Sequence, residues 1–172
     1  MAVNLQNERK LLDNQGSKEA APGTMVSGCV PRDRAIVAVI DGLGGSFGAA
    51  IVKELRESFG DAVEIWALGV NSIATGAMMK AKANRGATGE NAVKVALPKA
   101  KAVMGPIAIT WANSMMGEIT PGLAEAVMIA QVPKILIPIS QDNIILAGHK
   151  YEPLANLIMD AIRRLALLAY LS

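Results

Sequence analysis

The chain has 172 residues, of which 52% are hydrophobic and 3% aromatic, and its formal net charge is +2. The length suits one domain with its own core, while the balanced charge and scarce aromatic rings argue against a nucleic-acid partner. No apolar run reaches the roughly 18 residues that span a bilayer, so we expect no membrane partner and a cytoplasmic location.

Residues 1–34 differ from the rest because they are polar and contain no extended apolar face. We predict a mobile N-terminal extension over 1–34 and a folded domain over 35–172. The sequence contains one cysteine, Cys29, and one histidine, His149, which excludes an internal disulfide and makes a metal cluster hard to assemble. We therefore predict no metal site.

An apolar run over 36–40 leads directly into a glycine-rich turn and then into a predicted helix over 49–58. Such a run is typical of a strand buried on both faces of a parallel sheet. Gly42 would permit a tight turn, Gly45 would let the backbone approach a ligand, and Gly48 would let the helix pack on the strand. A diphosphate here would meet the positive end of the helix dipole. The predicted nucleotide-binding loop comprises Asp41, Gly42, Leu43, Gly44, Gly45, Ser46, Phe47 and Gly48.

The glycine spacing is Gly-x-x-Gly-x-x-Gly, which departs from the usual dinucleotide fingerprint Gly-x-Gly-x-x-Gly. A tight strand-to-helix turn without a ligand is therefore the alternative interpretation. Asp41 would oppose a phosphate unless its carboxylate holds backbone N–H groups of the turn or binds a metal ion. We favour the turn-holding role.

Strands and helices alternate along the remaining sequence. Strands are predicted over 62–68, 101–106 and 134–139, with a short third strand or turn over 86–91 and a further edge strand over 143–147. Helices are predicted over 71–83, 92–96, 121–131 and 153–170. Thr120 would cap the helix over 121–131, and Pro121 suits its first position. This alternation predicts an α/β, three-layer Rossmann-like fold with a mostly parallel sheet of five or six strands in the order 3-2-1-4-5. Ligands of such sheets bind at the carboxyl edge beside the first strand.

The loops after the second and third predicted strands add candidate binding residues. In dinucleotide sites the second strand ends on Asp or Glu, which binds the ribose, but this chain has neither there. Asn71 and Ser72 occupy that place, where they would either bind a ribose or cap the next helix. Thr88 and Gly89 follow the third strand and complete the predicted cofactor-binding set.

Three residues are candidates for catalysis. Glu90 is the best-placed acid or base, and Asn113 and Ser114 are possible hydrogen-bonding partners of a substrate. The alternatives are a helix N-terminal acid for Glu90 and ordinary loop hydrogen bonds for the other two. The sequence predicts no particular reaction.

Six motifs stand out over 35–164: IDGLGGSFG, ALGVNSIATGAM, GATGENA, GPIAI, WANSMMGEITP and KILIPI. Through them the chain resembles an uncharacterised family of short bacterial Rossmann-like proteins, a domain of unknown function. The resemblance implies a fold and no reaction. The glycine spacing is also distantly similar to the nucleotide-binding half of atypical short-chain dehydrogenases, although their catalytic tyrosine and lysine are missing.

The last predicted helix carries enough apolar residues on one face to seat it on the sheet: Leu154, Leu157, Ile158, Ala161, Ile162 and Leu165. Further apolar residues lie on its other faces: Leu167, Leu168, Tyr170 and Leu171. Exposed apolar patches often mark an interface, so we predict a homo-oligomer through this helix.

Two hypotheses from different classes follow. The first is a protein that binds a small-molecule nucleotide or dinucleotide, with NAD or NADP as the expected cofactor. The alternative is a non-catalytic structural or interaction protein that keeps the fold without a ligand.

Overall fold

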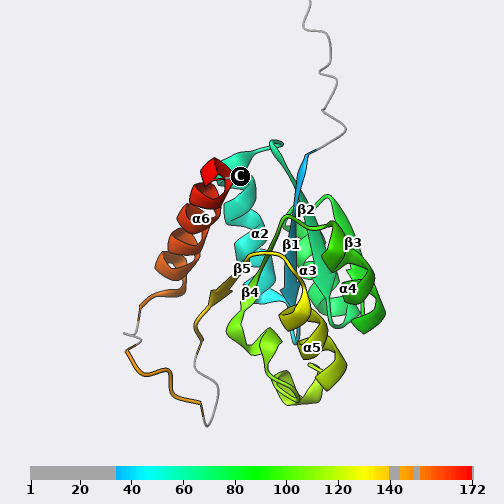
Figure 1. Ribbon diagram of the computed structural model, residues 1–172. Helices are drawn as coiled ribbons and strands as arrows, with labels where there is room; N and C mark the ends of the chain where they lie inside the picture. The colour runs from blue at the N-terminus through cyan, green and yellow to red at the C-terminus, as the bar shows by residue number, and fades with distance from the viewer. Residues whose placement is uncertain (1–33, 140–143, 149–151, 172) are drawn as a thin grey trace, which may run out of the picture. The chain divides into compact units, whose positions relative to one another are not determined.

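The computed structural model describes residues 34–139, 144–148 and 152–171 (Figure 1). The predicted N-terminal extension, apart from Arg34, lies outside the described residues, as do Cys29 and His149, so the predicted domain boundary stays a prediction. The strands are β1 (Ala35–Asp41), β2 (Val63–Gly69), β3 (Arg85–Thr88), β4 (Ala102–Pro106) and β5 (Lys134–Ile137). The α-helices are α2 (Ser46–Phe59), α3 (Ser72–Lys80), α4 (Glu90–Ala96), α5 (Pro121–Ile129) and α6 (Leu154–Leu171), and the 3₁₀ helices are η1 (Leu97–Lys99), η2 (Ile107–Thr110) and η3 (Met115–Gly117).

The five strands form one parallel sheet in the order β3-β2-β1-β4-β5. This confirms the predicted Rossmann-like fold and strand order. Asp41 at the end of β1 is in register with Gly69 at the end of β2, so the loops after both strands begin at the same edge of the sheet. The strand order reverses beside β1, because β2 and β3 are added on one side of β1 and β4 and β5 on the other. Sheets of this type bind ligands at that reversal.

Side chains alternate between the two faces of the sheet along each strand, and each face packs against its own set of helices. Val37 and Val39 pack in one cluster with α2, α3 and α6, whereas Ala38 and Ile40 pack in the other with α4 and α5. Figure 1 shows α6 beside α2 on the first face. Strands buried on both faces explain the unbroken apolar runs in the sequence.

Two helices begin at the caps that the sequence predicts. The Asn71 side chain accepts a hydrogen bond from the Ala74 N–H at 2.8 Å at the start of α3. The Thr120 hydroxyl accepts one from the Leu123 N–H at 3.0 Å, and Pro121 occupies the first position of α5, where a missing N–H costs nothing. These caps fix the two turns that follow β2 and precede α5.

Several predicted boundaries differ from the structure. The fifth strand ends at Ile137, because Pro138 has no N–H for a sheet ladder. In the described part of 143–147, only Ile144 forms an isolated bridge, so no sixth strand is seen there. The loop predicted between β4 and α5 contains η2 and η3, which shape one wall of the carboxyl edge.

The last helix seats on the sheet with the predicted face, and Ile158, Ala161, Ile162 and Leu165 are buried. Leu167 is 62% exposed, as expected. The expectation for Leu168 is wrong, because its side chain is half-buried against the core cluster. The side chains of Tyr170 and Leu171 lie outside the described ones. Within the part of the chain that is described, no helix has the length and apolar character needed to cross a bilayer.

Candidate functional site

A small cavity opens at the carboxyl ends of β1 and β4. Its volume is about 190 Å³. The residues that line it are Asp41, Gly42, Leu43, Gly44, Gly45, Ser46, Phe47, Pro106, Ala108, Met115 and Ile139. Residues 41–48, named the glycine loop below, supply most of this wall. The predicted loop therefore borders a cavity at the edge of the sheet where ligands of this fold bind.

Asp41 holds the glycine loop from its inner side. Its side chain is 3% exposed, Oδ1 accepts a hydrogen bond from the Gly42 N–H at 2.9 Å, and Oδ2 accepts one from the Gly48 N–H at 2.6 Å. These bonds tie the end of β1 to the first turn of α2. The predicted turn-holding role of Asp41 is confirmed.

Burial dominates the electrostatics of Asp41. Removal from water raises the pKa of this carboxyl above its usual range, and the nearby Glu118 carboxylate raises it further. Hydrogen bonds from the Gly48, Gly42 and Phe47 N–H groups act in the opposite direction, because they stabilise the charged form. Since both oxygens already accept backbone hydrogen bonds, Asp41 is a structural part of the loop.

The glycines of the loop have different neighbours. A Cβ at Gly45 would lie 2.5 Å from Ala74 Cα, and the residue has a φ of +72°. A Cβ at Gly48 would lie 2.8 Å from Asp41 Cβ, which confirms that this glycine permits helix-to-strand packing. A Cβ at Gly44, by contrast, would have no neighbour within 4 Å.

The expected role of Gly45 is therefore corrected. The sequence predicts that its missing side chain lets the backbone approach a ligand. The missing side chain instead makes room for the backbone of α3, and a positive φ disfavours any L side chain there. Gly44 is the loop position with open space.

Glu118, which the sequence analysis missed, lies against the glycine loop. Its Oε2 accepts a hydrogen bond from the Leu43 N–H at 2.6 Å. The Asn71 side-chain amide donates to Oε1 at 2.9 Å and to Oε2 at 3.0 Å. A Cβ at Gly42 would lie 2.8 Å from Oε2, so this glycine makes room for the carboxylate. The motif WANSMMGEITP contains Glu118, but no local spacing connects it to residues 43 and 71.

Asn71 joins the glycine loop to α3. Its Oδ1 caps α3, and its Nδ2 donates to the Leu43 carbonyl at 2.9 Å as well as to Glu118. The capping alternative is thus confirmed for Asn71, while a ribose-binding role stays a prediction. Ser72 is exposed in the first turn of α3, beside the cap.

Thr88 and Gly89 contact the end of β2. The Thr88 hydroxyl lies 2.7 Å from the Thr75 hydroxyl, and Thr75 packs over Gly69. Gly89 has a φ of +95° and donates its N–H to the Gly69 carbonyl at 2.9 Å. Both residues shape the turn before α4, and their predicted role in cofactor binding stays a prediction.

The Glu90 carboxylate connects α4 to α5. It accepts hydrogen bonds from the Lys94 ammonium and the Thr120 hydroxyl, and these two bonds lower the pKa of Glu90 below its usual range. This arrangement fits the alternative of a helix N-terminal acid better than a general acid, which needs a pKa near the working pH. Its catalytic role stays a prediction.

Asn113 and Ser114 make loop hydrogen bonds. The Asn113 N–H donates to the Ile119 carbonyl at 2.6 Å, with the side chain exposed and φ at +64°. The Ser114 hydroxyl donates to the Ala108 carbonyl at 2.6 Å. These bonds support the alternative interpretation and fold the segment that carries Glu118.

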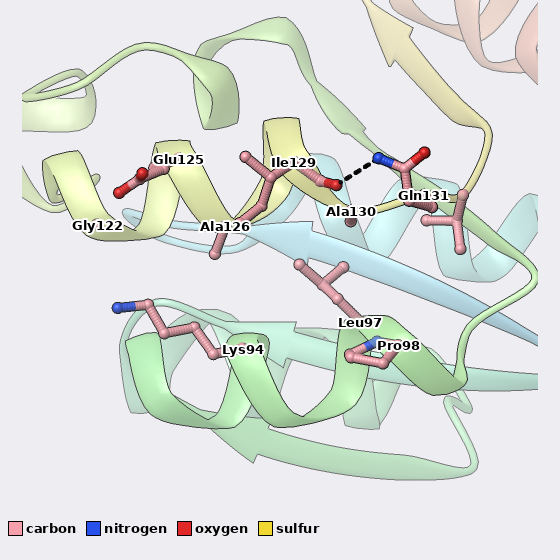
Figure 2. Close-up of a pocket in the computed structure, with 10 residues that line it drawn as sticks. Lys94, Leu97, Pro98, Gly122, Glu125, Ala126, Ile129, Ala130 and Gln131 are labelled. Atoms are coloured by element: carbon pink, nitrogen blue, oxygen red, sulfur yellow. Dashed lines mark hydrogen bonds between the residues drawn. The ribbon is translucent and has the colours of Figure 1, made fainter.

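A larger groove, of about 660 Å³, lies between α4 and α5 (Figure 2). Leu97 and Ala126 lie between the helices, and Lys94 and Glu125 lie toward one end. Ile129 beside it is 65% exposed. Among the described residues no group of three or more His, Cys, Asp or Glu side chains could hold a metal ion, here or elsewhere. The lining of the groove is thus mainly apolar and suggests no reaction.

Comparisons with known proteins identify the family. A solved structure, that of the FMN-dependent cysteine decarboxylase TvaF from thioviridamide biosynthesis, aligns with a TM-score of 0.45 and 17% identity and covers 78% of this chain and 88% of that one. A similarity of this degree assigns neither ligand nor reaction. No curated protein matches the sequence. Residues 36–169 match the family described as Domain of unknown function (DUF3842), and the chain therefore belongs to this uncharacterised family.

Proposed function

We propose that this protein binds a nucleotide-derived ligand, with NAD or NADP as the first candidates, and that its phosphates lie on the outer side of the glycine loop. The observation that carries the proposal is the pair of exposed residues Gly44 and Ser46, which line the 190 Å³ cavity at the N-terminus of α2. In the described part of the chain, their backbone N–H groups have no acceptor. Such groups, at the positive end of a helix dipole, are suited to a phosphate.

The size of the cavity limits what it encloses. Pockets that bury a whole drug-sized ligand occupy about 300–1,000 Å³. The cavity of about 190 Å³ would therefore hold the phosphates alone, and the rest of the ligand would lie along the surface at the carboxyl edge. The inner carboxylate of Asp41 does not compete for the same N–H groups, because it binds those of Gly42 and Gly48.

A thermal-shift screen against NAD, NADP, FAD, FMN, ATP, AMP and coenzyme A tests the proposal. A ligand at 100 times its dissociation constant should stabilise the fold by about 2.7 kcal/mol. We expect Gly44→Asp to remove this shift, because the open position would then carry a negative charge beside the phosphates. The matched control is Gly76→Asp in α3, where a Cβ is equally free of neighbours. No shift with any ligand, or an unchanged shift in Gly44→Asp, would contradict the proposal.

The alternative function, a non-catalytic interaction protein, is favoured by one feature. Val95, Met128 and Ile129 on α4 and α5 are each more than half exposed, at 56%, 55% and 65%. This alternative predicts no shift with any nucleotide. We propose no reaction. The Glu90 carboxylate and the Ser114 hydroxyl already make the hydrogen bonds described above, and the exposed Asn113 takes part in those bonds only through its backbone N–H.

Homo-oligomerisation through α6 is proposed on the exposure of Leu167. Light scattering at micromolar concentration should give a mass above that of the monomer, and Leu167→Glu should lower it. Leu168→Glu is the wrong variant for this test, since its side chain packs on the core and the change would destabilise the subunit itself. A monomeric parent protein would overturn this part of the proposal.

A further inference from the structure

A carboxylate from a distant segment lies at the place where β2 lacks one. Strand β2 ends at Gly69, and Asn71 stands where dinucleotide sites carry the acid that binds the ribose. Glu118, 47 residues further along the chain, accepts hydrogen bonds from the Asn71 amide through both of its carboxylate oxygens. The tertiary structure thus places a carboxylate at a position where the local sequence has none.

The backbone around Glu118 holds its side chain in place. Met115 and Ile119 are 7% and 0% exposed, and they anchor the segment on both sides of the glutamate. Between them Met116 and Gly117 have φ values of +58° and +88°. A non-glycine residue at positive φ is strained and persists only where the surroundings enforce it. The position of the carboxylate is therefore set before any ligand arrives.

The carboxylate keeps room for further donors. An ionised carboxylate has about four lone-pair sites. Oε2 accepts from both Leu43 and Asn71, whereas Oε1 accepts from Asn71 alone. The residue is half-buried, so Oε1 has capacity for a hydroxyl from a ligand.

The geometry points to Glu118 as the residue that recognises the ribose of the ligand and determines its specificity, an inference that rests on the proposed nucleotide function. The carboxylate accepts hydrogen bonds from the ribose hydroxyls. A 2′-phosphate at the same place would bring a second anion against Glu118. Among the described residues, no cationic side chain is bonded to Glu118. The site thus selects NAD-type over NADP-type ligands, by attraction to one and repulsion of the other.

A competing interpretation is that Glu118 imitates a bound phosphate and must leave before a ligand enters. The lining of the cavity argues against it, because Gly44 and Ser46, whose N–H groups form the proposed phosphate position, line the cavity and Glu118 does not. Glu118 instead lies between Leu43 and Asn71, on the β2 side of the loop. The two interpretations predict opposite effects of removing the charge.

Isothermal titration calorimetry with NAD, NADP and ADP-ribose tests the inference on the full chain. The parent protein should bind NAD at least 10-fold more tightly than NADP. In Glu118→Gln the ratio should fall to threefold or less, with weaker binding of NAD and ADP-ribose and unchanged or tighter binding of NADP. Glu118→Ala should do the same and serves if the glutamine variant is poorly folded. The matched control, Glu125→Gln on the exposed face of α5, should keep the parent ratio.

The outcomes separate the two proposals. Equal affinity of the parent for NAD and NADP, or an unchanged ratio in Glu118→Gln, overturns the role of Glu118 and leaves the nucleotide function standing. Tighter binding of both ligands by Glu118→Gln also overturns it, in favour of an internal anion. If neither the parent nor the variants bind any of these nucleotides, the proposed function itself fails, and the inference fails with it.

Discussion

The two sides of the glycine loop obey different constraints. On the inner side, Asp41, Gly45 and Gly48 face other parts of the protein, where they hold the turn or make room for α3 and for β1. On the outer side, Gly44 and Ser46 are exposed and line the cavity. One short segment thus serves the fold with one side and offers binding groups with the other.

This difference shows why a glycine pattern is an ambiguous sign of a ligand. The spacing that suggests phosphate binding is largely required by close packing, since Gly45 and Gly48 are needed even if no ligand ever binds. Among the glycines of the loop, only Gly44 has no neighbour within 4 Å of an added Cβ. The outer residues are therefore the ones whose substitution reports on function.

The largest effect should come from Gly45→Ala. The new Cβ would lie within 2.5 Å of Ala74 Cα at a residue with positive φ, so we expect a loss of about 3 kcal/mol or more in the free energy of unfolding. Gly44→Ala, one residue away, should change it by less than about 0.5 kcal/mol. Urea denaturation of both variants measures the difference. Equal losses would show that the inner and outer sides are not distinct.

A smaller loss, of about 2 kcal/mol, is expected for Asp41→Asn. The amide offers one acceptor where the carboxylate offers two, so a buried N–H of Gly42 or Gly48 loses its partner. Ser46→Ala on the outer side should lose less than about 0.5 kcal/mol. If the Asp41 variant were as stable as the parent, the carboxylate would not be holding the loop.

The loss in Asp41→Asn should also depend on pH. Because the pKa of Asp41 in the folded protein is raised above its usual 3.8, the unfolded chain releases the proton first as pH rises. The stabilising contribution of the protonated form is complete below 3.8 and is lost as pH rises through the folded value. The difference in unfolding free energy between parent and variant should therefore shrink from pH 3.5 to 7. A difference that grows with pH would mean that folding lowers the pKa of Asp41 and does not raise it.

The smallest effect concerns Asn71, whose side chain bonds to Leu43 of the glycine loop, to Glu118 and to the first turn of α3. Asn71→Asp keeps the acceptor that caps α3 but replaces the amide donor with a second carboxylate facing Glu118. We expect a loss of about 1 kcal/mol in the parent and less than about 0.5 kcal/mol in a Glu118→Gln background. A double-mutant cycle by urea denaturation gives the coupling. Additive losses would mean that Asn71 and Glu118 do not interact in solution.

The sequence by itself determined the architecture. Apolar runs without helical periodicity marked the strands, and their alternation with helices led to the parallel sheet and its order, because right-handed crossovers leave few other topologies. Asn71 and Thr120 were recognisable as caps, since capping depends on residues three positions apart. The turn-holding role of Asp41 was likewise accessible, because its partners lie within the same loop.

Only the tertiary structure decided which residues meet at the carboxyl edge. Glu118 contacts Leu43 across 75 positions of sequence, and this contact depends on how η3 folds back after β4, which no local spacing encodes. The same holds for Gly45, where the backbone of Ala74 in α3 leaves no room for a Cβ. Local patterns report interactions within a turn or a strand, whereas the site is built from segments that only packing brings together.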